Sequence, residues 1–426
     1  MLTARPITVS ADADALIIGA GPAGASAAIR LATAGWHVIL IEQHHFPRHK
    51  VCGECISAGS WALLDELGVG SELQHLAGPD LRQVGWMSAD RTLVAQMPAC
   101  PDGPYRYGRA LGRDYLDTVL VERARSLGVT VLQPARLLGV NGAAGRFECR
   151  YELRSRQLTG AAQLRSEGTL RAAVVIDAHG SWERGPAVSG TESGAARRGR
   201  RSDSDLLAFK ASFRNATLPS GFLPVIALNG GYGGMVVADH GRATLACCIR
   251  RDALEKCRRD APGEAAGAAV ESYLRRSCHG IAEALEEAQR DGPWLSAGPV
   301  QPGVRIATSD GVLRVGNAAG ETHPLIGEGI GMALQSTALL AAQLGRKPAV
   351  ALDAKHLDRI QRAYAAEWRR EFTSRLRIAQ LYAYLAMNPA LSPTARRVLA
   401  RIPRVLTFAA RMAGKARPAP VRRSLN

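Results

Sequence analysis

Residues 15–42 read ALIIGAGPAGASAAIRLATAGWHVILIE, and this stretch decides the fold of the N-terminal part of the chain. An apolar run ends at Gly19, an alanine-rich segment continues to Gly35, and a second apolar run ends at Glu42. An apolar run, a small-residue helix and another apolar run form the pattern of a strand–helix–strand unit with parallel strands. The pattern therefore predicts a Rossmann-like unit over residues 14–42.

Three glycines stand at the turn between the first strand and the helix, in the spacing G-x-G-x-x-G. Gly19 permits a tight turn, Gly21 lets a pyrophosphate touch the backbone, and Gly24 lets the helix pack closely on the strand. The amides at the helix N-terminus would face the phosphates, and Glu42 would accept a hydrogen bond from a ribose hydroxyl. Together these residues predict a dinucleotide-binding site.

The chain has 426 residues, of which 46% are apolar, so it is long enough for two or three domains. It contains no apolar run long enough to span a bilayer and no secretory leader, which favours a cytoplasmic protein. The eight cysteines form neither a disulfide scaffold nor a zinc site, so no metal is expected. Cys52 and Cys55 form either a redox pair or two packing residues beside a ligand.

Positive charge is concentrated at the C-terminus. The net charge is +16, and after Glu371 there are eleven Lys and Arg residues with no Asp or Glu. Apolar residues between these charges favour an amphipathic end that binds an anionic surface, either membrane lipid at the periphery of a bilayer or an acidic carrier protein. A solvated basic face is the other reading. Nucleic acid is not expected as a partner, because it would leave residues 12–345 unexplained.

The middle of the chain changes character. Residues 206–300 hold short apolar or alternating segments between Gly, Pro and Asn, which is typical of an antiparallel sheet. A buried strand and a glycine-rich loop, VGNAAGETHPLIGEGIGMALQS, then follow at residues 315–336. The parallel α/β part is therefore interrupted by a β-rich insertion and resumed, and the second glycine-rich loop belongs to the first domain.

Six motifs in this order resemble a known family: GAGPAGASAA, FPRHKVCGECIS (46–57), Arg113 at a helix start, DAHGSWER (177–184), WLSAGPV (294–300) and the loop at 315–336. The family is that of FAD-dependent oxidoreductases, which includes monooxygenases of the p-hydroxybenzoate hydroxylase type, geranylgeranyl reductases and flavin-dependent halogenases. The resemblance implies an α/β fold in which a Rossmann-like FAD-binding domain is interrupted by an antiparallel β-rich substrate domain and followed by a helical, basic C-terminal extension. The expected boundaries are 12–75, 105–195 and 301–345 for FAD binding, 76–104 for strands of the substrate sheet, 206–300 for the substrate domain, and 350–426 for the C-terminal region.

The resemblance also implies which residues hold FAD, so that the two glycine-rich loops grip opposite ends of one cofactor. Asn317 stands where relatives carry an acidic residue, and its amide would contact the ribitol chain. At the start of the last helix, backbone groups would face the pyrimidine edge of the flavin, where negative charge develops on reduction. The expected cofactor-binding residues are Gly19, Gly21, Ala23, Gly24, Glu42, Arg48, Lys50, Cys52, Gly53, Arg113, Asn317, Pro324, Gly327, Gly329 and Ile330.

His323 is the candidate catalytic residue, because a histidine in the flavin loop would exchange protons near neutral pH. A structural role is the alternative for this histidine. Glu328 would cap the following helix.

The branches of the family differ in the substrate sheet. Geranylgeranyl reductases carry a motif resembling GYxWxFP, whereas this chain has Gly234 in place of Trp and Val237 in place of Pro. The WxWxIP motif of halogenases is absent, and no lysine stands between Lys50 and Lys210.

The resemblance therefore favours a monooxygenase of secondary metabolism, in which NAD(P)H reduces the flavin and oxygen adds at its C4a carbon. The oxygen would pass to a lipophilic or aromatic small molecule, or to a carrier-bound acyl chain. A double-bond reductase or dehydrogenase, a halogenase and a non-redox cyclase are the alternatives.

Overall fold

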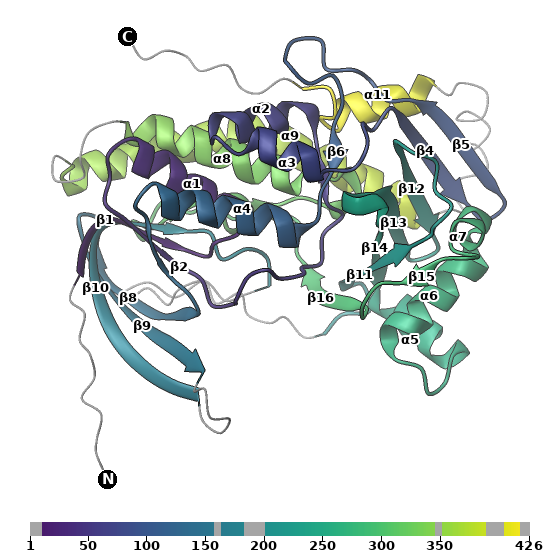
Figure 1. Cartoon of the computed structure of the whole chain (residues 1–426), viewed down its shortest axis with the longest axis horizontal. Coiled ribbons are helices and arrows are strands. Elements are labelled where there is room, and N and C mark those ends of the chain that lie inside the picture. Colours follow the sequence, from purple (N-terminus) through teal and green to yellow (C-terminus); the bar gives the residue numbers. More distant parts are fainter. Residues whose placement is uncertain (1–10, 157–162, 183–200, 346–351, 389–403, 418–426) are drawn as a thin grey trace.

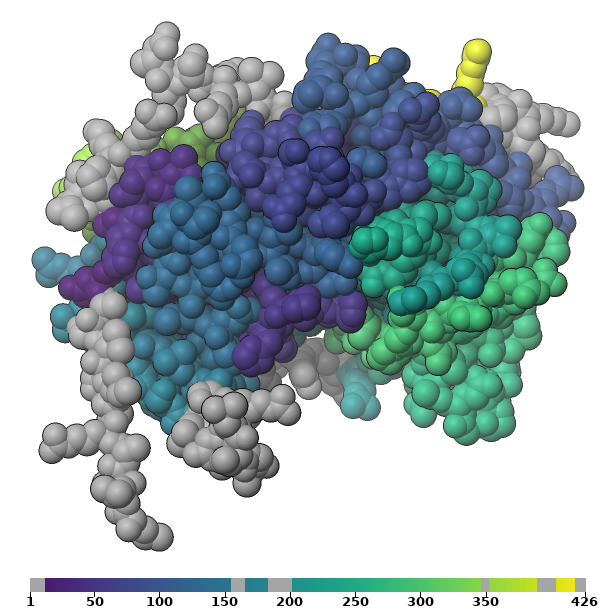
Figure 2. Space-filling view, viewed as in Figure 1, coloured from purple at the N-terminus to yellow at the C-terminus, as the bar shows by residue number. Residues whose placement is uncertain are grey.

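The computed structural model describes residues 11–156, 163–182, 201–345, 352–388 and 404–417. Two lobes lie side by side, one built on the N-terminal strand–helix–strand unit and the other on a second sheet (Figures 1 and 2). This architecture, with its helical C-terminal segment, confirms the predicted fold class. Parts of the expected domain ranges lie outside the described residues: 157–162, 183–195, 350–351, 389–403 and 418–426.

The sheet of the first lobe has a parallel centre and an antiparallel edge. Its strands run in the order β7, β2, β1, β10, β9 and β8, and β18 also pairs with β10. Strands β7, β2, β1, β10 and β18 are mutually parallel, while β9 and β8 extend the sheet as an antiparallel meander. The bounds are β1 (Ala11–Ile18), β2 (Val38–Ile41), β7 (Thr130–Leu132), β8 (Ala135–Ala143), β9 (Arg146–Arg156), β10 (Gln163–Asp177) and β18 (Leu313–Arg314).

Helices cover this sheet, and α1 lies among them almost fully buried. Its small side chains allow α4 and α8 to approach closely, and Ser26 Oγ lies 2.7 Å from Thr337 Oγ1 of α8. The alanine content of α1 is therefore a packing requirement, because a larger side chain would hold these helices apart. The helices of this lobe are α1 (Pro22–Thr33), α2 (Ala58–Glu66), α3 (Gly70–Leu76), α4 (Arg113–Ser126), α8 (Gly329–Leu344) and α9 (Ala354–Met387).

The second sheet has the order β15, β11, β14, β13, β12, β4 and β5, and β16 pairs with β11. All its pairs are antiparallel except β12 with β4, where a hairpin of β4 and β5 from an earlier part of the chain joins the sheet. The bounds are β4 (Gln83–Ser88), β5 (Arg91–Gln96), β11 (Leu206–Arg214), β12 (Phe222–Leu228), β13 (Gly231–Val237), β14 (Ala243–Arg250), β15 (Gln289–Arg290) and β16 (Leu295–Val300).

Helices cover both faces of the second sheet. The outer face packs on three helices that the strand-like sequence pattern did not predict: α5 (Arg251–Asp260), α6 (Ala266–Ser277) and α7 (His279–Ala284). The inner face contacts the end of α9 and, over β4 and β5, helix α11 (Arg404–Met412). Two short antiparallel ribbons stand apart from these sheets: β3 (Cys55–Ile56) with β6 (Arg109–Ala110), and β17 (Gly303–Val304) with β19 (Gly320–Glu321).

The C-terminal region is part of the folded body where it is described. Arg375 and Lys415, two of the eleven cations expected to face an anionic surface, are buried instead. Arg377, Arg404, Arg411 and Arg417 are exposed. Among the described helices, none is long and apolar enough to cross a membrane.

Candidate functional site

The turn between β1 and α1 forms a cradle of bare backbone. Gly19 has φ +94°, and a Cβ atom there would lie 2.6 Å from the carbonyl oxygen of Ala178. A Cβ on Gly24 would lie 1.7 Å from the carbonyl oxygen of Gly19, so only glycine fits where the helix meets the strand. No described side chain caps α1 at Gly21, and the helix amides remain available to an anion.

Glu42 directly follows β2 beside this cradle, and its carboxylate is fixed by its neighbours. Its Oε2 accepts a hydrogen bond from the amide of Ala20 at 2.9 Å, and its Oε1 accepts one from the amide of His44 at 2.9 Å. Arg48 Nη1 lies 3.3 Å from the same carboxylate, so the buried negative charge is paired. This fixed carboxylate next to a phosphate cradle is the arrangement that binds a ribose.

Arg113 lines the cavity at the start of α4 and makes a bidentate contact with Asp117. Its Nε and Nη2 atoms each lie 2.7 Å from an oxygen of this buried carboxylate. Burial works against the guanidinium charge, but Asp117 outweighs this effect and raises the pKa of Arg113. The guanidinium is therefore a fixed cation near Gly21, where a Cβ would lie 3.4 Å from Arg113 Nη2.

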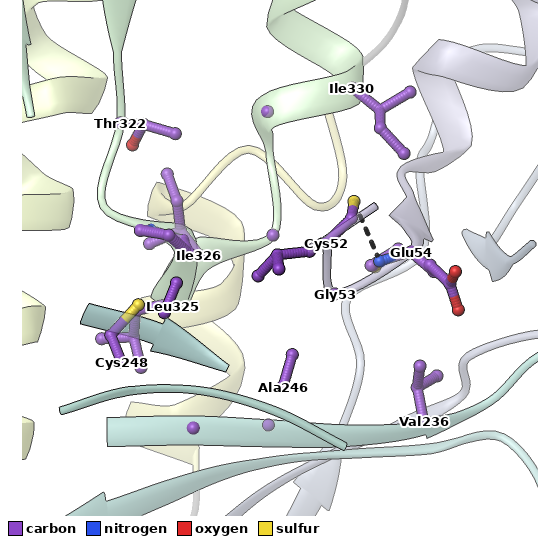
Figure 3. Close-up of a pocket in the computed structure, with 18 of the residues that line it drawn as sticks. Cys52, Gly53, Glu54, Val236, Ala246, Cys248, Thr322, Leu325, Ile326 and Ile330 are labelled. Atoms are coloured by element: carbon purple, nitrogen blue, oxygen red, sulfur yellow. Dashed lines mark hydrogen bonds between the residues drawn. The ribbon is translucent and has the colours of Figure 1, made fainter. Parts of the chain in front are cut away.

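At the other end of the cavity, the loop that leads into α8 faces the Cys52–Gly53–Glu54 loop (Figure 3). Gly327 has φ +58° and a turn conformation that favours glycine. Glu328 is the N-cap residue of α8, but its side chain caps no helix amide and lies 3.5 Å from Lys415, contrary to the expected cap. The α8 amides are thus left to face the cavity.

Cys52 and Cys55 are both free thiols in this loop. Cys52 Sγ accepts a hydrogen bond from the amide of Glu54 at 3.3 Å. Burial raises the pKa of Cys55, which keeps its thiol protonated and unreactive. This environment favours the packing role over a redox pair.

His323 does not line the cavity, although its neighbours Thr322 and Pro324 do. Its Nδ1 lies 3.0 Å from the hydroxyl of Tyr232 on β13, and burial lowers its pKa to about 4. The ring is therefore neutral at pH 7 and packed beneath the loop. This placement gives no support to the predicted role in proton exchange.

The sheet side of the cavity is apolar. Strands β12, β13 and β14 contribute three titratable groups to this wall. They are Tyr232 of β13 and the two consecutive cysteines of β14, Cys247 and Cys248. Burial raises the pKa of Cys248 to about 12, and it raises those of Tyr232 and Cys247 well above their usual values. The other residues that α11 and β4, β12, β13 contribute include Val84, Trp86, Leu223, Val225, Met235, Val236, Leu406, Ala409 and Ala410.

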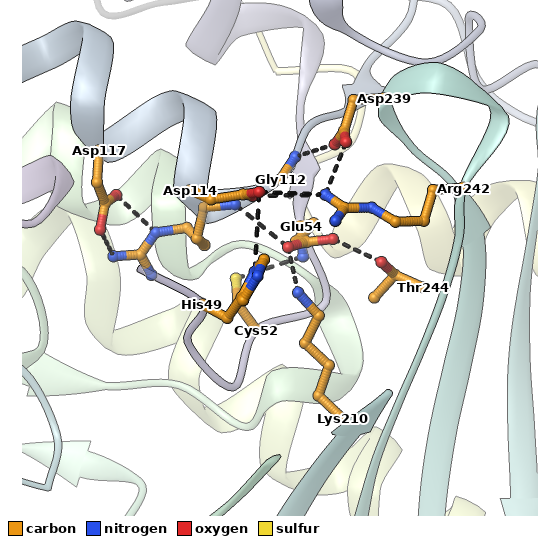
Figure 4. A network of polar contacts seen from close by, with 11 residues as sticks. His49, Cys52, Glu54, Gly112, Asp114, Asp117, Lys210, Asp239, Arg242 and Thr244 are labelled. Carbon is orange, nitrogen blue, oxygen red and sulfur yellow. Dashed lines mark hydrogen bonds and ion pairs between the residues drawn. The ribbon is translucent and has the colours of Figure 1, made fainter. Parts of the chain in front are cut away.

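A buried polar network, which the sequence did not suggest, surrounds Glu54 at the end of the Cys52–Glu54 loop (Figure 4). Glu54 has φ +57° and forms an ion pair with Lys210 of β11. Its carboxylate also accepts hydrogen bonds from Thr244 Oγ1 at 2.6 Å and from the amide of Arg113 at 3.2 Å. Nearby, Asp239 accepts a hydrogen bond from the amide of Gly112 at 2.6 Å. These contacts join the first lobe to the second sheet at the site.

The predicted cofactor residues gather around one cavity of about 310 Å³. All of them line it except Gly24, which packs the helix on the strand. Asn317 lies on the wall, and its Nδ2 donates to Ser181 Oγ at 2.6 Å. A bare phosphate cradle, a ribose carboxylate and a second helix N-terminus fit the two ends of FAD.

A comparison with known protein families matches the FAD binding domain over residues 12–369. The chain belongs to the FAD binding domain family. This FAD-dependent oxidoreductase is 29% identical over 400 residues to a menaquinone reductase of Mycobacterium tuberculosis, covering 92% of this chain and 89% of the relative. The resemblance drawn from the motifs is therefore confirmed, and FAD is the cofactor that the residues fit.

Solved structures share the fold of this FAD-dependent oxidoreductase. A flavin-dependent brominase superimposes with a TM-score of 0.69 at 17% identity, covering 95% of this chain and 94% of the other. The p-nitrophenol 4-monooxygenase of Pseudomonas putida DLL-E4 superimposes with a TM-score of 0.67 at 17% identity, covering 96% of each chain. Because the fold is common to several chemistries, the choice among them depends on the walls of the cavity.

Proposed function

We propose that this protein is an FAD-dependent reductase that adds two hydrogen atoms to a lipophilic, quinone-class substrate. The apolar sheet side of the cavity is the observation that carries this proposal, because it favours a hydrocarbon-rich molecule. The similarity to a menaquinone reductase, which extends over nearly the whole of both chains, supports the same class of substrate.

The protonation states on this wall also favour reduction over oxygenation of a phenol. A phenol becomes electron-rich when a nearby base accepts its proton. On the described sheet side, Cys248 and Tyr232 keep their protons at pH 7 because their pKa values are raised. The carboxylate of Glu54 already accepts hydrogen bonds from Thr244 and Arg113 and pairs with Lys210. An apolar substrate requires no such base.

When bound, FAD would carry a hydride from a nicotinamide coenzyme, NADH or NADPH, to the substrate. The substrate would gain this hydride and one proton taken from the solvent, and the coenzyme would lose a hydride, so the two-electron change balances. The chain contributes the binding residues at both ends of the cofactor, and the apolar wall excludes water from the substrate.

Product analysis separates this function from oxygen transfer. The purified FAD-loaded protein would be incubated with NADH or NADPH and a menaquinone in detergent micelles, without oxygen and under ¹⁸O₂. We expect a product that carries two additional hydrogen atoms and forms in both conditions. A product that carries one ¹⁸O atom and forms only under oxygen would overturn the proposal in favour of a monooxygenase.

A matched pair of variants tests whether the apolar wall binds this substrate. Val225→Asp places a charge on the cavity wall, whereas Val304→Asp places one on an exposed site of β17. We expect kcat/KM to fall about tenfold or more for Val225→Asp, because a buried charge costs free energy on binding. Val304→Asp should retain the unmodified value.

A lipophilic substrate of this class resides in membranes, and one surface suits contact with them. Phe408 and Met412 are exposed on α11, next to the exposed cations Arg404 and Arg411. We infer that this face rests on anionic lipid. Phe408→Ser combined with Met412→Ser should weaken co-sedimentation with anionic vesicles, whereas Val304→Ser should not. Equal binding to the vesicles by the unmodified protein, the double variant and Val304→Ser would contradict this contact.

A further inference from the structure

The described C-terminal segment places a lysine at the end of the cavity where the loop before α8 faces the Cys52–Glu54 loop. Lys415 follows α11 and is 8% exposed. Its Nζ donates to the carbonyl oxygen of Gly327 at 3.1 Å and to Cys55 Sγ at 3.3 Å. These partners belong to the two loops that enclose this end of the cavity, and Lys415 itself lines the wall.

The segment is docked closely enough to hold this ammonium group in place. Gly414 has φ +96°, and a Cβ there would lie 3.4 Å from the carboxylate of Glu328. Leu406 and Ala410 of α11 are buried against the second sheet and fix the segment upstream. The position of Lys415 is therefore set by the packing of the residues that precede it.

The charges around Lys415 do not cancel. Glu328 lies 3.5 Å away, and Glu371 pairs with Arg375 at 2.7 Å and with Arg417 at 2.9 Å. Three cations thus face two carboxylates, which leaves one positive charge in excess. Burial disfavours the charged form of Lys415, but the neighbouring carboxylate of Glu328 favours it, and the pKa of Lys415 is raised, so the amine stays protonated at pH 7.

A cation here would act on the electronic state of the cofactor. The N-terminus of α8 already presents positive partial charge to the same end of the cavity. Two-electron reduction places negative charge on the flavin ring, and a fixed positive charge in a buried site stabilises that charge. A residue that only held the C-terminal segment in place would need no charge at the cavity wall.

We propose that Lys415 is a catalytic residue, supplied by the C-terminal segment, that stabilises the reduced state of FAD by electrostatic contact at the ring end of the site. This role holds whether the reduced flavin passes its electrons to a quinone, to oxygen or to another acceptor. It therefore stands apart from the proposed function, and no substrate is needed to test it.

The test is the two-electron midpoint potential of the bound FAD, measured by equilibration with redox dyes. In Lys415→Gln the side chain can still donate to the Gly327 carbonyl, but the charge is gone. We expect the equilibrium constant for reduction to fall at least about tenfold, which is about 30 mV for a two-electron couple. Lys415→Arg should keep most of the original potential, and the exposed control Arg411→Met should keep all of it.

Limited trypsin digestion of the same proteins reports whether the C-terminal segment stays docked. An unchanged potential in Lys415→Gln would overturn the proposal, whether the segment is docked or released. Equal loss of potential in Lys415→Gln and Lys415→Arg would overturn it too, because charge would then not be the cause. Support requires a low potential in the glutamine variant and a restored potential in the arginine variant.

Discussion

Gly24→Ala is expected to yield protein that does not retain FAD. The added Cβ would lie 1.7 Å from the carbonyl oxygen of Gly19, a main-chain atom that can move only if the β1–α1 turn opens. Overpacking of this kind costs about 1–3 kcal/mol or more, and here the displaced atoms are those of the phosphate cradle. We expect the dissociation constant for FAD to rise at least about 100-fold, measured by titration of the flavin-free protein.

Gly35→Ala is the matched control, because it also replaces a glycine of the same strand–helix–strand unit. Gly35 has φ +88°, and a Cβ there would meet no atom within 4 Å. The backbone strain should lower stability by about 1–2 kcal/mol and leave FAD affinity within a few-fold of the original. If both variants bound FAD equally well, the close contact at Gly24 would have no role in the cradle.

The phosphate cradle could be predicted from the sequence because its requirements are local. Gly19, Gly21 and Gly24 are separated by a few residues, and their spacing reflects contacts within one turn. The second glycine-rich loop could be placed in the same domain for a similar reason, since a buried strand leads into it. Motifs of this kind carry their geometry in the sequence.

The buried lysines of the site could not be predicted from local patterns, because their contacts join distant parts of the chain. Lys415 approaches Cys55 across 360 positions, and Lys210 approaches Glu54 across 156. No spacing or periodicity in the sequence predicts such pairs. The sequence around Lys415 indicates a basic tail, and the sequence around Lys210 indicates a strand. A weak signal did exist for α5 and α6, whose sequences RDALEKCRRD and AGAAVESYLRRS are rich in residues that favour helices.

Removing either partner of the Glu54–Lys210 ion pair is expected to destabilise the whole site. Both side chains are almost fully buried, so Glu54→Gln leaves an unpaired ammonium and Lys210→Met leaves an unpaired carboxylate. Loss of one partner of a buried pair typically costs about 3–5 kcal/mol. We expect a decrease of this size in the free energy of unfolding for each single variant, measured by urea denaturation of the flavin-free protein.

The double variant Glu54→Gln/Lys210→Met decides whether the two residues act as a pair. It removes both charges at once, so its loss should be smaller than the sum of the single losses by about 0.5–3 kcal/mol. The exposed pair Asp358–Arg362 on α9 is the control, and Arg362→Met should cost less than about 1 kcal/mol. Because Glu54 also accepts a hydrogen bond from the Arg113 amide, its loss should loosen the Cys52–Gly53 loop and weaken FAD binding as well. Strictly additive losses would mean that the two charges do not interact, and that the lobes are joined at the site by other contacts.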